Sequence, residues 1–280
     1  MALSWPWHFI SLSEPEKQHR HELLTLRGYY AQLSILLAII LLRACTAFPS
    51  IDQPTRGRRQ KSWLDSPVFT GWFETRRQYL LCLTWFCWLL FLCVWSTGND
   101  YLHFTKALGH VGLSQLPLQV AMSPAFYITS TPRALSLVSI LTSIPQPTVT
   151  AYHRLFARVV IAPLLVGHAF FYCLFFLQSS HPDFGSLFSK RIRDPDVQWG
   201  ITAVSMAVAV MIFARPIGAT SGIWKGSIKN RRRAFYITHV LLVGLLCLAA
   251  YVHVAQAQVF VLESLGIFVV NLVCCYKTVQ

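Results

Sequence analysis

Four histidines inside long apolar segments constrain this chain more than any other feature. His153 and His168 lie fifteen residues apart in one apolar segment, and His239 and His253 lie fourteen residues apart in another. Ionisable residues inside a membrane-spanning segment are costly, and they are therefore candidates for a functional role. A fold for this chain must therefore place the two pairs of imidazoles where they can have a functional role inside the membrane.

The composition is that of a polytopic membrane protein. Of the 280 residues, 54% are hydrophobic and only 12% are charged, which excludes a disordered chain. The formal net charge of +13 would suggest nucleic-acid binding in a soluble protein. Here the Lys and Arg residues lie between apolar segments, as expected for loops that face an anionic cytosolic leaflet. We therefore expect membrane lipid as a partner, and no nucleic acid.

The apolar segments predict an all-α helical bundle with seven transmembrane helices. A helix of about 20 apolar residues crosses the ~30 Å hydrocarbon core. Pro117, inside the third segment, is expected to kink its helix. The apolar residues 134–144 are expected to lie along the interface or to re-enter the membrane. The predicted spans are 29–48, 78–97, 107–128, 151–177, 199–213, 234–254 and 259–276.

The distribution of basic residues predicts the orientation. With seven spans, seven of the 24 Lys and Arg residues lie on the N-terminal side and the other seventeen on the opposite side. The positive-inside rule then places the N-terminus outside and the C-terminus in the cytosol. Residues 1–28 form an extracellular or lumenal segment, 29–48 the leading helix, 49–77 a basic cytosolic loop, and 277–280 a short cytosolic tail. We expect the plasma membrane rather than an internal one.

The four histidines are predicted to form two levels in the membrane. The spans 151–177 and 234–254 run in the same direction, because one span separates them. His153 and His239 then lie near the cytosolic ends of their helices. His168 and His253 lie near the outer ends, and fourteen residues at ~1.5 Å each separate the levels by roughly 21 Å.

The unequal spacings predict a local irregularity. Fourteen residues are close to four helical turns, so His239 and His253 share a helix face. Fifteen residues leave His168 about 60° away from His153. Pro163 lies between them. We predict a proline-associated kink or a single π-bulge, which would absorb one residue and bring both rings to one face.

Paired imidazoles on two parallel helices favour haem as the cofactor. Neutral imidazole suits iron, copper and zinc, and two histidines on facing helices suit a bis-histidine haem built for electron transfer. Arg154 and Arg158 follow His153 closely and are candidates to pair with the carboxylates of the inner haem. They are equally explained as flanking positive charges. The competing interpretation of the four histidines is that they are separate structural or proton-relay residues.

Several short motifs resemble the ferric reductase-like transmembrane domain, which fungal ferric reductases and NADPH oxidases share. The resemblance covers about residues 108–276. It rests on Leu108-Gly109, Gln115-Leu116-Pro117-Leu118, Tyr152-His153-Arg154 with Arg158, Trp199-Gly200-Ile201, and Phe235 four residues before His239, followed by His253. Ala157 stands where glycine is common in the family, and the first histidine spacing is fifteen instead of fourteen.

The resemblance implies a ferric reductase-like haem domain over residues 78–276, with six helices around the haems. It implies two b-type haems, an inner one on His153 and His239 and an outer one on His168 and His253. Electrons would cross to ferric iron or another outside acceptor, in iron and ion transport, and no residue is singled out as catalytic. No Gly-rich dinucleotide fingerprint occurs, so we expect FAD and NADPH on a separate flavoprotein reductase and not on this chain.

Other functions remain open at this stage. One is a seven-span receptor or transporter without enzymatic activity, which is less favoured because we expect histidines and no carboxylate inside the spans. Another is a truncated, inactive reductase. A third is a haem cytochrome of the ascorbate-dependent kind, against which the Tyr-His-Arg and Trp-Gly-Ile motifs weigh.

Overall fold

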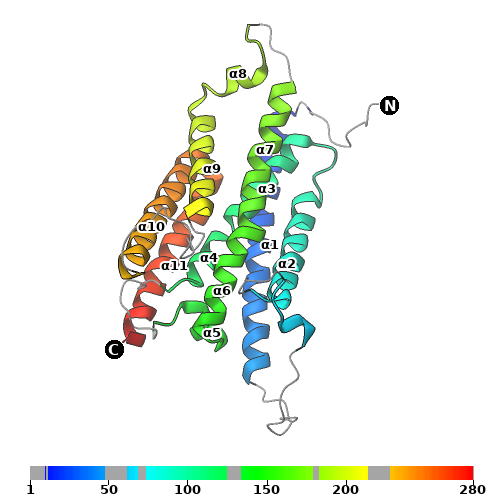
Figure 1. Cartoon of the computed structure of the whole chain (residues 1–280). Helices are drawn as coiled ribbons and strands as arrows, with labels where there is room; N and C mark the ends of the chain where they lie inside the picture. The colour runs from blue at the N-terminus through cyan, green and yellow to red at the C-terminus, as the bar shows by residue number, and fades with distance from the viewer. Residues whose placement is uncertain are drawn as a thin grey trace.

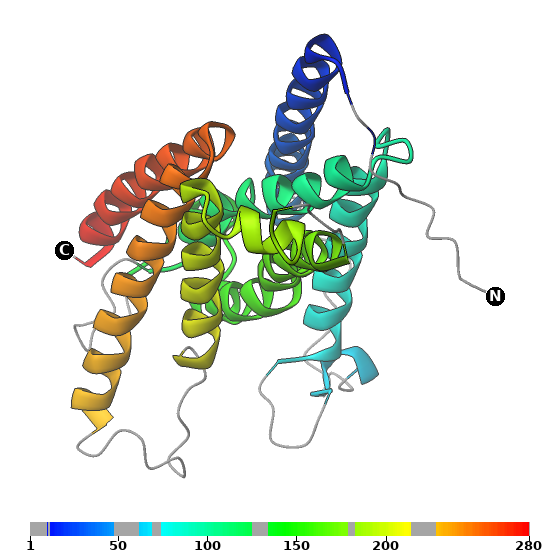
Figure 2. The same ribbon diagram turned by 90° about the horizontal axis from the view of Figure 1, so that it is seen from above.

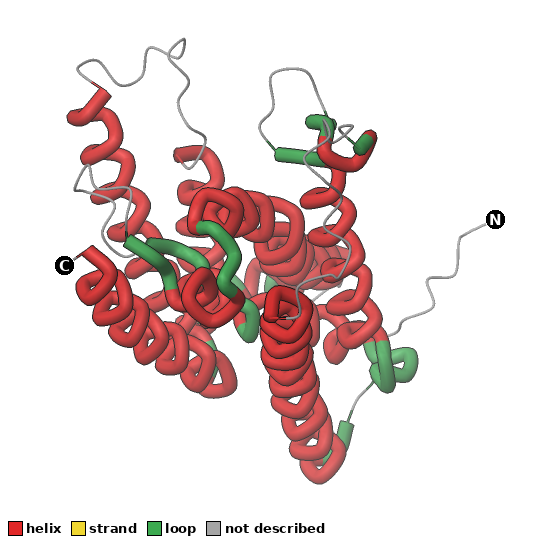
Figure 3. The backbone as a smooth tube through the Cα atoms, turned by 90° about the horizontal axis from the view of Figure 1, so that it is seen from below, coloured by secondary structure: helices red, strands yellow, loops and turns green. Residues whose placement is uncertain are grey.

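The protein is a bundle of helices (Figure 1). The computed structural model describes residues 10, 12–47, 62–68, 74–124, 134–178, 183–213 and 228–279. Within these ranges there is no β-strand; an isolated antiparallel bridge joins Pro67 and Thr75, and Figure 3 shows helices joined by short loops. The predicted all-α fold is confirmed.

The helices follow the predicted spans closely, with several longer than expected. α1 starts well before the predicted leading span, and α9 starts at Pro195, a residue well suited to the first helical turn. The elements are α1 Glu14–Ala47, η1 Trp63–Asp65, α2 Arg76–Val94, α3 Tyr101–Leu113, α4 Leu116–Ala121, α5 Leu137–Thr142, α6 Gln146–Phe156, η2 Ala157–Ile161, α7 Ala162–Gln178, α8 Leu187–Arg191, α9 Pro195–Phe213, α10 Ile228–His253 and α11 Ala255–Val279.

Six of the described helical stretches are long and apolar enough to cross a membrane. They comprise α1, α2, the continuous run from α6 to α7, α9, α10 from Arg233 onward, and α11. Large apolar side chains cover their outer faces. Leu33 on α1 and Leu241 on α10, for example, are each 61% exposed. An aqueous surface would not carry so much contiguous apolar area, whereas a lipid-facing surface requires it.

The predicted third span is not one continuous helix, so the count of seven spans is not confirmed. α3 ends at Leu113, and the short α4 begins at Leu116; residues 125–128 lie outside the described ranges. Pro117 explains the break, because it has no N–H to donate to the Leu113 carbonyl and its ring crowds that carbonyl. The sequence predicted a kink at Pro117, but the helix ends and restarts there.

α3 is the buried centre of the bundle. Eleven of its thirteen residues are buried, including Phe104, Ala107 and Val111. α7 lies along one side of α3 in Figure 1, and α1 and α2 contact it from others. Figure 2 shows the bundle from above, with α9 and α10 side by side. α3, α7, α9 and α10 supply most of the candidate site.

One polar contact inside the bundle was not expected. Glu263 lies within α11, so the expectation that the spans hold no carboxylate is wrong. Its carboxylate accepts a hydrogen bond from the side-chain amide of Gln32 on α1. A buried or half-buried carboxylate in an apolar environment needs such a donor, and this bond ties α1 to α11.

Candidate functional site

His168 and His253 face each other across the gap between α7 and α10. The centroids of their rings are 6.4 Å apart, with an angle of 61° between the ring planes. The two rings come from helices that are distant in sequence. In Figure 1, α9 lies between α7 and α10. The structure therefore brings together the two histidines that the sequence predicted for the outer level.

Backbone carbonyls hold both rings of this pair from behind. Nδ1 of His168 lies 2.7 Å from the carbonyl oxygen of Thr105 on α3, and Nδ1 of His253 lies 2.6 Å from that of Asp196 on α9. A carbonyl oxygen only accepts hydrogen bonds, so each Nδ1 carries the proton. Each Nε2 is then left with a lone pair for a metal, the arrangement usual for a ligating histidine.

A glycine lies against each of these two rings. A Cβ atom added at Gly109 on α3 would come within 2.9 Å of Cγ of His168. A Cβ added at Gly200 on α9 would come within 2.7 Å of Cε1 of His253. Real Cβ atoms do not approach other atoms so closely, so only glycine leaves space for the imidazoles where they are.

His153 and His239 form the second pair, between α6 and α10. Their ring centroids are 6.3 Å apart, with 70° between the planes. Nδ1 of His153 lies 2.9 Å from the carbonyl oxygen of Gln119 on α4, which fixes the same tautomer as in the first pair. The Gln119 side-chain nitrogen donates to the His153 carbonyl at 2.9 Å and lies 3.5 Å from its Nε2.

His239 is held differently from the other three histidines. Its Nδ1 atom is buried and has no hydrogen-bond partner in the described part of the chain. The ring instead stacks on Phe235, one turn earlier in α10, with centroids 5.6 Å apart and 25° between planes. Packing, and not a hydrogen bond, therefore orients this imidazole.

A π-helical segment brings His153 and His168 into register. η2 spans Ala157–Ile161, between the two histidines and directly before the turn that holds Pro163. A π-helical turn accommodates an extra residue without advancing the helix face. The predicted π-bulge is confirmed, and it explains how spacings of fifteen and fourteen residues serve two facing pairs.

The separation within each pair fits two imidazoles on opposite sides of one metal ion. A metal–nitrogen bond is about 2.0 Å, and the ring centre lies roughly 1.1 Å beyond the nitrogen, so two axial imidazoles have centroids about 6.2 Å apart. The measured 6.3 and 6.4 Å agree with this value. Among the described residues, no group of three His, Cys, Asp or Glu side chains is placed to bind a metal. A haem iron needs only two protein ligands.

Comparison with known proteins identifies the family. The family described as "Ferric reductase like transmembrane component" matches residues 108–250, just over half of the chain. The chain belongs to the ferric reductase-like transmembrane family. It is thus an integral membrane protein and a membrane redox component, and domains of this family generally bind haem. No curated protein and no solved structure matches the chain.

The match to the ferric reductase-like family includes three of the four histidines. It ends at residue 250, three residues before His253. The structure nevertheless places His253 opposite His168, at almost the separation found in the other pair. The geometry therefore adds His253, which lies beyond the matched residues, to the three histidines within them.

The two arginines beside His153 are engaged with a carboxylate. Arg158 pairs with Glu74 at 2.6 Å, and the Arg154 Nε atom lies 3.8 Å from the same Glu74 oxygen. The Glu74 side chain is only 8% exposed, so it needs these cations. Sequence reasoning missed Glu74, because nothing in its spacing relates it to His153. Contact between the arginines and a haem carboxylate remains a prediction.

Two further histidines lie in α3, and the structure brings neither opposite another histidine. Nε2 of His103 lies 2.9 Å from a guanidinium nitrogen of Arg27, in a buried cluster near the start of α3. His110 packs edge-on against Phe260 of α11. Both side chains are buried, and neither belongs to a facing histidine pair.

Proposed function

We propose that this protein passes electrons one at a time across the membrane through two b-type haems. The single observation that supports this function is the geometry of the histidines. Two facing imidazole pairs lie on the same two helical stretches, each pair at the separation that one iron requires. Membership of a family whose domains generally bind haem agrees with it.

The four histidines would be the axial ligands. When bound, haem supplies an iron that alternates between the ferric and ferrous states without changing its two axial ligands. His153 and His239 would hold the inner group, and His168 and His253 the outer one. The hydrogen bonds from Nδ1 to backbone carbonyls keep three of the rings in the ligating tautomer and increase the basicity of Nε2.

Apolar packing between the two levels would keep the electron path dry. Val160, Leu164 and Leu246 are each buried and lie, along their helices, between the inner and outer histidines. Such side chains exclude water and ions, so charge crosses as an electron and not as an ion. Arg154 and Arg158 are proposed to assist at the inner level by pairing with haem carboxylates, in addition to Glu74.

The proposed orientation has the N-terminus outside and the inner pair toward the cytosol, in the plasma membrane. In this arrangement α3 and α4 form the third of seven crossings, and residues 78–276 form the haem-binding domain. Electrons would enter at the inner pair from a separate flavoprotein reductase. They would leave to ferric iron outside, where each ferric ion gains one electron and becomes ferrous.

Sealed liposomes test this function. The purified protein is reconstituted into vesicles that enclose a membrane-impermeant reductant, and a ferric chelate is added outside with a ferrous-specific dye. We expect ferrous iron to form outside only when the protein is present, and His168→Ala to prevent it. A wild-type protein that purifies without haem, or vesicles that reduce no more iron than protein-free vesicles, would contradict the proposal.

A further inference from the structure

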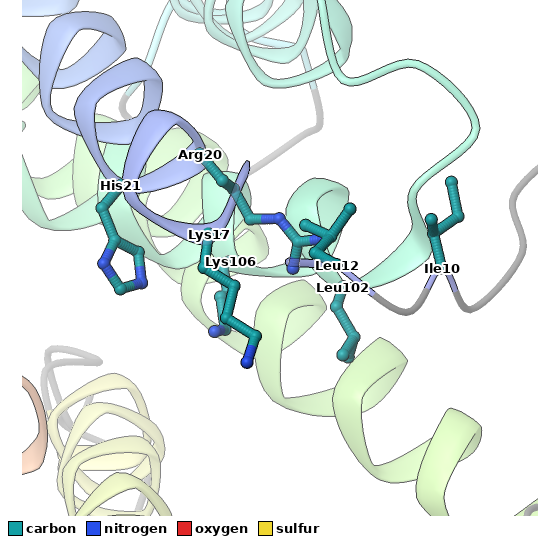
Figure 4. Close-up of a pocket in the computed structure, with 7 residues that line it drawn as sticks. All are labelled: Ile10, Leu12, Lys17, Arg20, His21, Leu102 and Lys106. Carbon is teal, nitrogen blue, oxygen red and sulfur yellow. The ribbon is translucent and has the colours of Figure 1, made fainter. Parts of the chain in front are cut away.

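A cationic pocket lies outside the two histidine pairs, between the first turns of α1 and the beginning of α3. It has a volume of about 310 Å³. Lys17, Arg20 and His21 of α1 and Lys106 of α3 line it, together with three aliphatic side chains (Figure 4). The figure shows the amino groups of the two lysines extending to the same side.

Arg20, which lines this pocket, is paired with a carboxylate at the start of α3. The residue is only 8% exposed, and one of its terminal nitrogens pairs with Asp100, the N-cap of α3. Its Nε atom is buried and has no hydrogen-bond partner in the described ranges. This Nε atom has almost no accessible surface, so a molecule in the pocket does not reach it, and the part of Arg20 that bears on the pocket is its charge.

The charges around the pocket do not cancel. Asp100 compensates Arg20, and Glu14 compensates Lys17 at 2.6 Å. No carboxylate of the described chain pairs with Lys106, which is half-buried on α3. An uncompensated cation in a wall that otherwise carries only basic and aliphatic side chains favours an anion with several acceptor oxygens.

We propose that this pocket binds a small oxyanion with two or more negative charges, either a polycarboxylate or a phosphate group. Lys106 would supply the uncompensated charge, and Lys17 would supply a second ammonium group beside it. The volume admits a molecule of the size of citrate or a single phosphate headgroup. The phosphate can come from solution or from a lipid, and the experiment below separates these sources.

The position of the pocket relates it to the His168–His253 pair. Lys106 precedes Gly109 by three residues, so the two share a face of α3 about one turn, or ~4.5 Å, apart. Thr105, whose carbonyl holds His168, is the neighbour of Lys106 in the chain. The binding site stands without the proposed function; if the pair holds haem as proposed, the bound anion lies next to the outer haem.

Thermal unfolding of the purified full-length protein in a non-ionic, phosphate-free detergent tests the site. The melting temperature is measured by tryptophan fluorescence against sodium citrate or inorganic phosphate, with sodium chloride at the same ionic strength as the reference. We expect a saturable increase beyond that caused by chloride, because a ligand that binds the folded state stabilises it. This readout reports anion binding whether or not haem is present.

Two variants and one control identify the residues. Lys106→Gln is expected to weaken the apparent affinity about tenfold, as for the loss of one charge-assisted hydrogen bond. Lys17→Gln removes the second lysine of the pocket, whose charge Glu14 already compensates, and it should weaken binding less. Lys190→Gln removes an exposed lysine of α8 that does not line the pocket, and it should leave binding unchanged.

Nanodiscs separate the two sources of the anion. In phosphatidylcholine discs, stabilisation by citrate or phosphate identifies a soluble ligand. Stabilisation only when phosphatidylglycerol replaces phosphatidylcholine, lost in Lys106→Gln, identifies a lipid headgroup. Stabilisation by neither source, or stabilisation that both pocket variants retain in full, would overturn the proposal.

Discussion

The two histidine pairs have nearly equal separations but different supports. Around His168 and His253, both Nδ1 atoms bond to carbonyls of neighbouring helices, and a glycine leaves space for each ring. Around His153 and His239, only the first ring has such a carbonyl partner, and Phe235 orients the second by stacking. The His168–His253 pair, the outer one in the proposed orientation, is therefore fixed by the backbone, whereas half of the His153–His239 pair, the inner one, depends on side-chain packing.

This difference shows where each pair can be broken. Backbone carbonyls and glycines hold their positions as long as the helices do, so the outer pair is sensitive to any added atom or change of helix register. The ring of His239 has no hydrogen-bond partner on Nδ1 and is oriented by packing against Phe235. Substitutions beside this ring should therefore weaken haem binding at the inner pair without abolishing it. Substitutions and deletions at the two pairs should therefore differ in the size of their effects.

The largest effect is expected from single-residue deletions that change helix register. Deleting Gly244 from α10 shortens the spacing of His239 and His253 to thirteen residues and turns one ring by ~100° relative to the other. We expect at least one haem to be lost. Deleting Val159 from η2 should instead convert the π-helical turn into α-helix and retain both haems, because His153 and His168 are then fourteen residues apart. Haem quantified per chain is the measurement, and equal loss in both deletions would contradict the role given to η2.

Filling the space beside the outer rings should remove about half of the haem. Gly109→Ala and Gly200→Ala each place a Cβ within 3 Å of an imidazole, so that ring must move from its ligating position. Gly244→Ala is the matched control, since no atom lies within 4 Å of an added Cβ there. Absorbance of the extracted haem measures the result. Full haem content in both outer variants would show that the rings tolerate displacement.

Loss of the stacking partner of His239 should weaken the inner haem without removing it. We expect Phe235→Ala to increase transfer of haem to a scavenger protein about tenfold, the lower end of the range for groups that orient a ligand. Phe268→Ala, on the lipid-exposed side of α11, serves as the control. Unchanged transfer in Phe235→Ala would mean that iron coordination alone orients His239.

The smallest effects are expected at the arginines. Arg158→Gln leaves the buried Glu74 without its 2.6 Å partner and should lower the free energy of unfolding by about 1–3 kcal/mol. Arg154→Gln removes a longer contact of 3.8 Å, made by a side chain that is 43% exposed, and should cost less than about 1 kcal/mol. Denaturant titration in detergent compares the two. Equal destabilisation would contradict the assignment of Arg158 as the main partner of Glu74.

The sequence predicted the parts of the site that follow helical periodicity. The pairing of the four histidines across two helical stretches and the π-bulge followed from spacings of fourteen and fifteen residues and from Pro163. Gly109 and Gly200 lie in motifs that the sequence shows, but the motifs alone did not indicate that these glycines make room for the rings. That role depends on how closely α3 approaches α7 and α9 approaches α10, which the sequence does not express.

Contacts between distant segments escaped prediction for a physical reason. Thr105 and Asp196 act through backbone carbonyls, so their side chains carry no signal of the hydrogen bonds. Glu74 and Glu263 find partners 84 and 231 residues away in the chain. Pro117 was noticed, but propensity alone did not distinguish a kinked helix from two short ones.

Removal of one ligand from each level tests the two-haem arrangement most directly. The wild-type protein, His168→Ala and His239→Ala are purified in parallel, and haem per chain is determined with reduced-minus-oxidised spectra. We predict about two haems in the wild type and about one in each variant, with the remaining haem still in a bis-histidine, low-spin spectrum. A His168→Ala protein that retains the wild-type amount of haem would contradict the arrangement.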